Sequence, residues 1–172
     1  MKKFLPLLLL AFVSLFIFSC KDDDDQDFDT YSQMRDATGT FTSADGFTLT
    51  MDINIQSTDV VLVYRRVGNA WQIIPKTYYL DNVSGFPTDR ELDYNFDFTT
   101  QEVNIRTQAN FNQVTQMTTG EATQYLSNQT FRVVLVPASA AKGTSTVDTS
   151  DYNAVIKYYN LNDSNVKVTK VN

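Results

Sequence analysis

Residues 92–111 read LDYNFDFTTQEVNIRTQANF, and this stretch decides the fold of the chain. Apolar and polar residues alternate strictly from 92 to 99, and the same pattern returns from 103 to 111. Because successive side chains of a strand point to opposite faces, each segment buries one face and exposes the other. The connection through Thr100 and Gln101 is short, so the two segments are predicted to form an antiparallel hairpin.

Further segments on both sides of this hairpin show strand patterns. Residues 47–55 carry apolar side chains at every second position, and with residues 40–43 they flank Asp45-Gly46, a dipeptide that favours a tight hairpin turn. Residues 59–67 and 130–136 are nearly continuous runs of β-branched and apolar residues, which is typical of central strands covered on both faces. Each of these segments is therefore predicted to be a strand.

The connecting segments are shorter or less regular. Residues 70–74 follow a turn at Gly68-Asn69 as a return strand, which Pro75 ends or places at a sheet edge because proline cannot donate to a ladder. Residues 81–90 have the composition of a loop. A helical turn is expected near residues 120–126.

The C-terminal part predicts a short helix near residues 151–161. Apolar and aromatic residues recur there at helical spacing, namely Tyr152, Val155, Ile156 and Tyr159. Ser150 or Asp151 can cap the first turn. Val166 and Val168 suggest a final strand.

The order of these elements favours an all-β fold. Roughly seven short strands without intervening helices are typical of an antiparallel β-sandwich. We therefore expect residues 39–172 to form one β-rich domain, an immunoglobulin-like sandwich with a short C-terminal helix. A small open barrel, or a single sheet packed on the terminal helix, is the alternative.

The first residues have the pattern of an export signal. Lys2 and Lys3 precede an apolar run that ends at Ser19-Cys20, and the run is too short to span a bilayer comfortably. The end of this run resembles a lipobox, although Ile17 stands where leucine is usual and Phe18 is bulky. The resemblance implies a lipoprotein signal peptide, residues 1–19, and acylation of Cys20 before cleavage. The alternative is a plain secretory signal that is cut elsewhere.

Residues 20–38 are expected to form a lipidated acidic tether. Lys21 is followed by a run of aspartates that repels itself and buries no apolar area. Cys-Lys followed by acids resembles the export signal of surface-exposed lipoproteins in Bacteroidetes. Segments 60–66, 92–98 and 125–136 also resemble small surface lipoproteins of that group, of the flavobacterial type. The resemblance implies a domain anchored in the outer membrane and exposed at the cell surface, and it implies no catalytic residues.

Composition excludes several classes of function. The chain has a net charge of −6, so nucleic acid, which requires a basic face, is not an expected partner. It contains no histidine, and its only cysteine is assigned to lipid, so common zinc sites and Ser-His or Cys-His catalysis lack their parts. We expect no cofactor and no metal.

Three weaker patterns remain as alternatives. The acids of the 92–99 strand region, Glu91, Asp93 and Asp97, are expected to face solvent, but two converging acids would suffice for glycoside hydrolysis. The loop oxygens of Asp81, Asn82, Asp89 and Glu91 suit calcium but lack regular spacing. The aromatic residues Trp71, Tyr78 and Tyr79 could form a sugar or peptide platform, although such rings are more often core.

The leading hypothesis is a non-enzymatic binding or structural module, anchored through Cys20 and displayed from the outer membrane. Its partners would be the membrane, through the lipid, and a glycan or protein ligand. The alternatives are a carboxylate-based glycan hydrolase, which requires two acids in one concave pocket, and a subunit of an envelope assembly, which requires a large exposed apolar patch.

Overall fold

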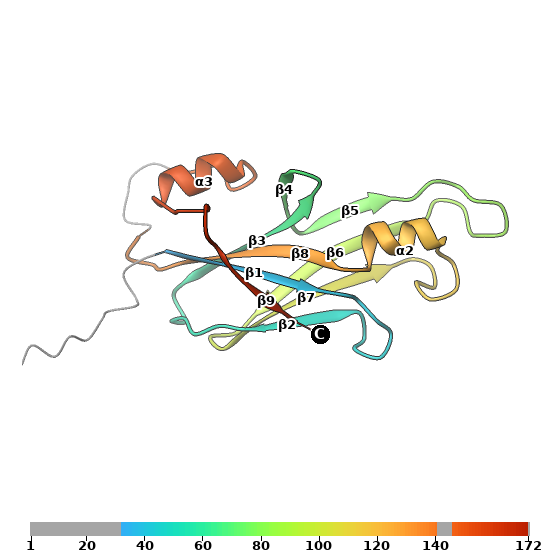
Figure 1. The fold of residues 1–172 in the computed structure, drawn as a ribbon, viewed down its shortest axis with the longest axis horizontal. Coiled ribbons are helices and arrows are strands. Elements are labelled where there is room, and N and C mark those ends of the chain that lie inside the picture. Colours follow the sequence, from blue (N-terminus) through green and yellow to red (C-terminus); the bar gives the residue numbers. More distant parts are fainter. Residues whose placement is uncertain (1–31, 141–145, 172) are drawn as a thin grey trace, which may run out of the picture.

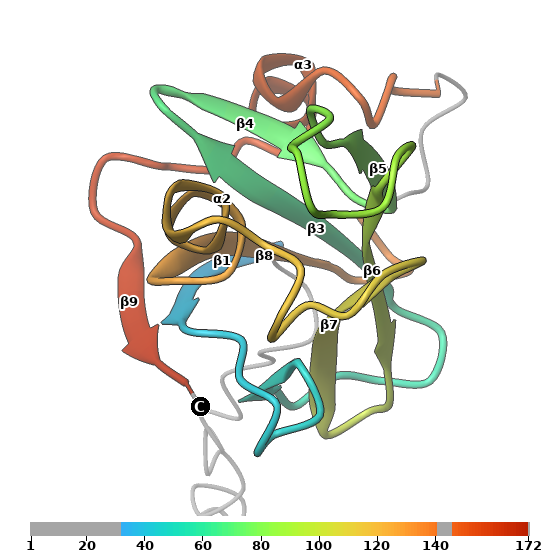
Figure 2. The ribbon, with the colours of Figure 1, turned by 90° about the vertical axis from the view of Figure 1, so that its right-hand side faces the viewer.

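The computed structural model describes residues 32–140 and 146–171, which form two packed β-sheets (Figures 1 and 2). The predicted signal peptide, Cys20 and the aspartate run lie outside the described residues. The described part therefore tests the predicted domain and not its predicted anchor.

One sheet has five strands in the order β4-β3-β8-β1-β9, and the other has four in the order β2-β7-β6-β5. The strands of the first sheet are β1 Gln33–Gly39, β3 Val60–Val67, β4 Ala70–Ile73, β8 Gln129–Val136 and β9 Lys167–Lys170. Those of the second are β2 Thr48–Asp52, β5 Lys76–Tyr79, β6 Glu91–Phe98 and β7 Glu102–Ala109. The pairing of β1 with β9 is parallel, and the other pairings are antiparallel.

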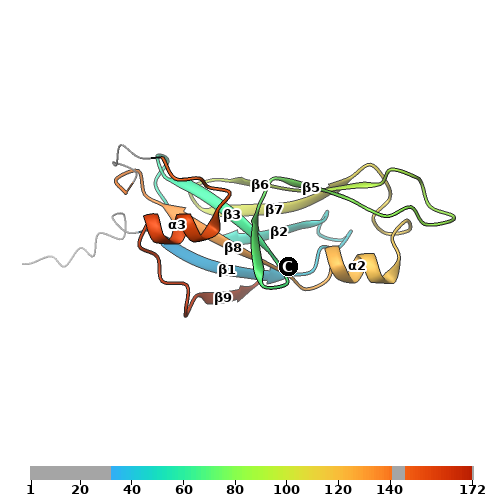
Figure 3. The same cartoon turned by 90° about the horizontal axis from the view of Figure 1, so that it is seen from above.

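The two helices of the described residues are short and lie toward opposite ends of the long axis (Figures 1 and 3). They are α2, Thr119–Tyr125, and α3, Tyr152–Tyr158. Both were expected from the sequence, and both begin with a side-chain cap, Thr118 for α2 and Asp151 for α3. The all-β sandwich with a short C-terminal helix is thereby confirmed.

The strand order differs from the order A-B-E-D and C-F-G of immunoglobulin constant domains. The immunoglobulin likeness therefore lies in the architecture of two packed, mainly antiparallel sheets. The sheets do not close into a barrel.

The core fills the space between the sheets. The β6–β7 hairpin pairs as predicted, with Phe98 opposite Val103 and Leu92 opposite Ala109. Its alternating side chains meet those of the other sheet, and the buried set includes Leu49, Met51, Val61, Val63, Leu92, Val103, Ile105, Phe131 and Val133. Burial of apolar area at roughly 25 cal/mol per Å² makes this layer the main source of stability.

The other face of the five-stranded sheet is covered by α3, which lies beside β4 in Figure 2. Tyr64, Val134 and Val136 are buried there against Tyr152. This second layer explains why β3 and β8 read as continuous apolar runs, because both faces of the central strands are covered.

The structure moves the start of the domain toward the N-terminus. The tether was expected to reach residue 38, but β1 begins at Gln33 and lies between β8 and β9. Its side chains do not alternate simply, because Asp36 is buried and its carboxylate accepts bonds from Arg132 Nε at 2.7 Å and Nη2 at 2.9 Å. Because the buried Asp36 interrupts the apolar alternation, the sequence pattern did not reveal this strand.

The hairpin predicted from residues 40–43 and 47–55 is wrong. The turn at Asp45-Gly46 exists, with Gly46 at φ 59°, but residues 40–43 form no strand and β2 pairs with β7. Phe47 also has a positive φ of 55°, which directs the chain from the first sheet to the second. The turn therefore connects two sheets and does not fold one ladder.

Candidate functional site

The acids proposed for hydrolysis lie on the outward face of β6, as expected for solvent-facing residues. Asp93 accepts a hydrogen bond from Thr77 Oγ1, and Asp97 forms an ion pair with Arg106 on the neighbouring strand. Glu91, Asp93 and Asp97 line neither of the two hollows described below. The structure does not bring these acids together as a catalytic pair.

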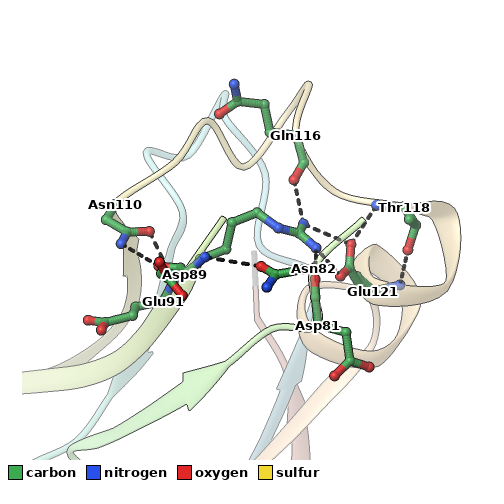
Figure 4. Close-up of polar contacts among 9 residues, drawn as sticks. Asp81, Asn82, Asp89, Glu91, Asn110, Gln116, Thr118 and Glu121 are labelled. Carbon is green, nitrogen blue, oxygen red and sulfur yellow. Dashed lines mark hydrogen bonds and ion pairs between the residues drawn. The ribbon is translucent and has the colours of Figure 1, made fainter. Parts of the chain in front are cut away.

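The loop acids proposed for calcium do not converge either (Figure 4). Asn82 Oδ1 accepts a bond from the backbone N–H of Asp89 at 3.2 Å, and the carboxylates of Asp81 and Glu91 point in different directions. Across residues 32–140 and 146–171, no group of three or more acids, cysteines or histidines is arranged to hold a metal ion.

The Arg90 guanidinium lies next to the loop in which a calcium site was considered. Arg90, which is 1% exposed, donates from Nη2 to Asp81 O at 2.6 Å and from Nη1 to Gln116 O at 2.7 Å (Figure 4). The same group binds Glu121 Oε1 and Oε2 at 2.6 and 3.0 Å. Arg90 therefore binds the Asp81 and Gln116 backbone oxygens and the Glu121 carboxylate.

Glu121 both pairs with Arg90 and caps the start of α2. Its carboxylate also accepts the backbone N–H of Thr118 at 2.7 Å and completes a capping box at the start of α2. The hydrogen bonds from Arg90 hold the pKa of Glu121 below its usual range. The Arg90 cluster is thus a structural connection among α2 and two loops.

The three aromatic residues proposed as a platform are separated. Tyr78 packs inside the sandwich against Tyr94, with ring centroids 5.5 Å apart, whereas Tyr79 is 74% exposed. Trp71 lies on the opposite side of the molecule's core, against Tyr152 of α3 at 5.8 Å. No common platform exists, but Trp71 does border a hollow.

This hollow, which we call the β4–α3 pocket, has a volume of about 440 Å³. It lies between the turn before β4 and the first turn of α3. Its lining includes Asn69, Trp71, Asp151, Tyr152, Asn153 and Asp163. It therefore combines two aromatic side chains with two carboxylates and two amides.

The polar groups of the β4–α3 pocket are held by the fold. Asp151 Oδ1 accepts the backbone N–H groups of Asn153 and Ala154 at 2.9 and 3.1 Å, as the cap of α3. Asp163 Oδ2 accepts the Tyr152 hydroxyl at 3.2 Å and lies 3.8 Å from Arg132 Nη1. Both carboxylates are thus positioned, and their remaining lone pairs are available to accept bonds.

Arg132 supports the pocket from the sheet side. Its guanidinium lies 4.3 Å from the Trp71 ring centroid and donates to the Tyr152 hydroxyl. Burial raises the pKa of Tyr152, while the bond from Arg132 acts in the opposite direction. Trp71 and Tyr152 therefore form an uncharged aromatic wall of the pocket, which Arg132 holds in place.

Sequence reasoning found parts of this pocket and missed its composition. Trp71 was singled out with the wrong neighbours, and Asp151 only as a cap. Asp163 was missed because it lies in a polar turn after α3, and only the contact of that turn with Arg132 gives it a role. No local pattern could have joined these residues.

Comparison with family models, with curated proteins and with solved structures found no match to this chain. Within the described residues, none of the helices has the length and apolar character needed to cross a membrane.

Proposed function

We propose that this protein is a lipid-anchored, non-enzymatic binding module displayed from the outer membrane, and that it binds a neutral saccharide in the β4–α3 pocket. The anchor rests on Ser19-Cys20 and the aspartate run after it. Two or more acyl chains on Cys20 would keep the domain on its membrane. The acidic run would hold it away from anionic head groups.

The observation that supports the ligand is the grouping of Trp71 with Asp151 and Asp163 in one hollow. The indole ring offers flat, amphipathic area of the kind that packs on a sugar ring. Carboxylates accept and amides both accept and donate, which suits vicinal hydroxyl groups. The volume of about 440 Å³ is in the range of small-molecule sites.

A glycan hydrolase is the rival, and it would have to use Asp151 and Asp163, the acids that share this pocket. Both acids have structural roles that account for their positions, Asp151 as the cap of α3 and Asp163 as the acceptor of the Tyr152 hydroxyl. Binding without cleavage is therefore the function we favour. Release of reducing ends from an oligosaccharide would favour the rival.

The binding experiment uses the full-length chain in detergent and a panel of neutral cello-, xylo-, malto- and chito-oligosaccharides. Trp71 is the only tryptophan, so its fluorescence reports on the pocket directly. We expect a saturable change with at least one sugar, weakened about tenfold by Asp163→Asn through loss of a charged acceptor. Asp93→Asn is the matched control, because Asp93 lies outside the pocket. Absence of binding across the panel, or equal effects of the two variants, would contradict the proposed ligand.

The anchor has its own experiment. Replacement Cys20→Ser should abolish incorporation of labelled palmitate and move the protein out of the membrane fraction, because the thiol that accepts the lipid is lost. Protease added to intact cells should degrade the wild-type domain. Full protection would contradict surface display, and membrane retention of the variant would contradict the lipid anchor.

A further inference from the structure

Three arginines are almost fully buried, namely Arg65, Arg90 and Arg132, with exposures of 3%, 1% and 6%. Two of them follow the usual rule that a buried charge is paired. Arg90 makes bonds to both carboxylate oxygens of Glu121, and Arg132 makes the same double contact with Asp36. Arg65 is the exception, because no ion pair of Arg65 is found within the described residues.

Neutral groups surround the Arg65 guanidinium. Its Cζ lies 4.6, 4.9 and 5.5 Å from the ring centroids of Tyr94, Tyr78 and Tyr125. Nε and Nη2 donate to Gln129 Oε1 at 3.0 and 2.7 Å, and Nη2 also donates to Gln124 O at 2.7 Å. These contacts orient the group without neutralising its charge.

The tyrosines do not provide the missing negative charge. Burial raises the pKa of Tyr94 far above its usual value, and it raises the pKa of Tyr125 as well. The charge of Arg65 opposes both shifts but does not reverse them. At neutral pH Tyr94 and Tyr125 therefore contribute cation–π attraction and no phenolate.

Arg65 lines a hollow. A cleft of about 380 Å³ lies between the β3–β4 turn and the connection from α2 to β8, and Arg65 lines it. Nη1 has no acceptor among the described residues and is not sealed from solvent. The other lining groups include Tyr78, Gln124, Ser127, Asn128 and Thr130, and no aspartate or glutamate lines the cleft.

We propose that this cleft, the Arg65 cleft, binds a small molecule or chain end that carries an oxyanion, a carboxylate or a phosphate. Nη1 of the guanidinium offers its N–H groups to such an anion as charge-assisted hydrogen bonds, because Nε and Nη2 already donate to Gln129 and Gln124. Its orientation by Gln129 and Gln124 is already fixed, so little freedom is lost on binding. The bound oxyanion would complete the pairing that Asp36 and Glu121 provide for the other two arginines.

This site is separate from the β4–α3 pocket, which two carboxylates line. The Arg65 cleft would therefore attract anions that the β4–α3 pocket repels. A failure of the saccharide experiment leaves the anion proposal standing, and the reverse also holds.

The test compares two asparagine-to-aspartate variants of the full-length chain in detergent. Asn128→Asp adds a negative charge at the Arg65 cleft, and Asn160→Asp adds the same charge at the end of α3, outside the cleft. Both asparagines are exposed and have a positive φ, 55° and 52°, so the substitutions are matched in backbone and burial. The probes are sodium phosphate and sodium acetate, against sodium chloride at equal ionic strength.

Calorimetry should show saturable binding of phosphate or acetate to the wild type and to Asn160→Asp. Asn128→Asp should bind about tenfold more weakly, because a like charge is placed beside the anion. Arg65→Lys, which retains the charge but loses the Nη1 donor and the bonds to Gln129 and Gln124 that orient it, should also weaken binding. Phosphate alone or acetate alone would identify which oxyanion is preferred within the proposal. Equal binding by all variants, or no binding to the wild type above the chloride control, would overturn it and leave Arg65 a structural residue.

Discussion

Replacing Glu121 with glutamine removes one negative charge next to a guanidinium that water does not reach. The Arg90 side chain is 0% exposed and the Glu121 side chain 14%. Glutamine retains an oxygen that can accept one bond from Arg90 and the N–H of Thr118, and it is compatible with a capping box. The substitution therefore tests charge with little change in shape.

The magnitude follows from burial. Breaking a buried pair by removing one partner costs about 3–5 kcal/mol. Because glutamine preserves part of the bonding and Glu121 is slightly exposed, we expect a loss of about 2–3 kcal/mol of the free energy of unfolding. For a chain of this size that lowers the melting temperature by about 4–12 °C.

The matched control is Asp97→Asn, which breaks the ion pair with Arg106. That pair is exposed, with side-chain exposures of 37% and 54%, so its loss should cost less than about 1 kcal/mol. Urea unfolding of both variants, followed by circular dichroism, measures the difference. If Glu121→Gln costs no more than Asp97→Asn, burial does not strengthen the Arg90 pair and the reasoning fails.

Three further predictions concern the same structure. Folding lowers the pKa of Glu121, so its contribution to the free energy of unfolding is fully present above the usual pKa of 4.5 and is lost as pH falls through the folded pKa. The difference in stability between wild type and Glu121→Gln should therefore disappear in acid. A difference that stays constant with pH would contradict the assignment. Tyr152→Phe removes the hydroxyl shared by Arg132 and Asp163; it should cost about 1–3 kcal/mol and shift the emission of Trp71, whereas the exposed Tyr79→Phe should do neither. Gly39→Ala places a Cβ 2.3 Å from the Val171 carbonyl oxygen, so limited proteolysis should release the C-terminal segment faster. Gly120→Ala is the control: its Cβ would make an ordinary contact with Thr118 Oγ1 at 3.9 Å on a helical backbone, so it should be neutral or stabilising.

Local patterns predicted the elements whose burial depends on their own sequence. The β6–β7 hairpin was predicted from its apolar alternation. The central strands β3 and β8 were predicted from their nearly continuous apolar runs. The strand β1 was not visible, because Asp36 at a buried position is explained only by Arg132, which is 96 residues away. The same limit explains the false hairpin, since a correct turn at Asp45-Gly46 does not determine whether its arms share a sheet.

Both pockets were beyond local prediction for a related reason. Their walls come from segments far apart in the sequence, such as Trp71 with Asp163, and Arg65 with Gln129. Composition shows which residue types are present, but it could not place the acids in space. Only the packing of α3 on β4, and of α2 beside the β3–β4 turn, creates the hollows.

The distribution of charge sets Arg65 apart from the other two buried arginines, because no ion pair of Arg65 is found within the described residues. The chain has 20 acidic side chains against 14 basic ones, so a carboxylate partner is not scarce in this sequence. Arg90 and Arg132 each have one, and each lies where three or more segments meet. Arg65 also lies at such a junction, between β8 and α2, yet it lines a cleft without an acid. Within the described residues, Arg65 is a buried cation without a carboxylate partner, and the proposed oxyanion would supply the missing negative charge.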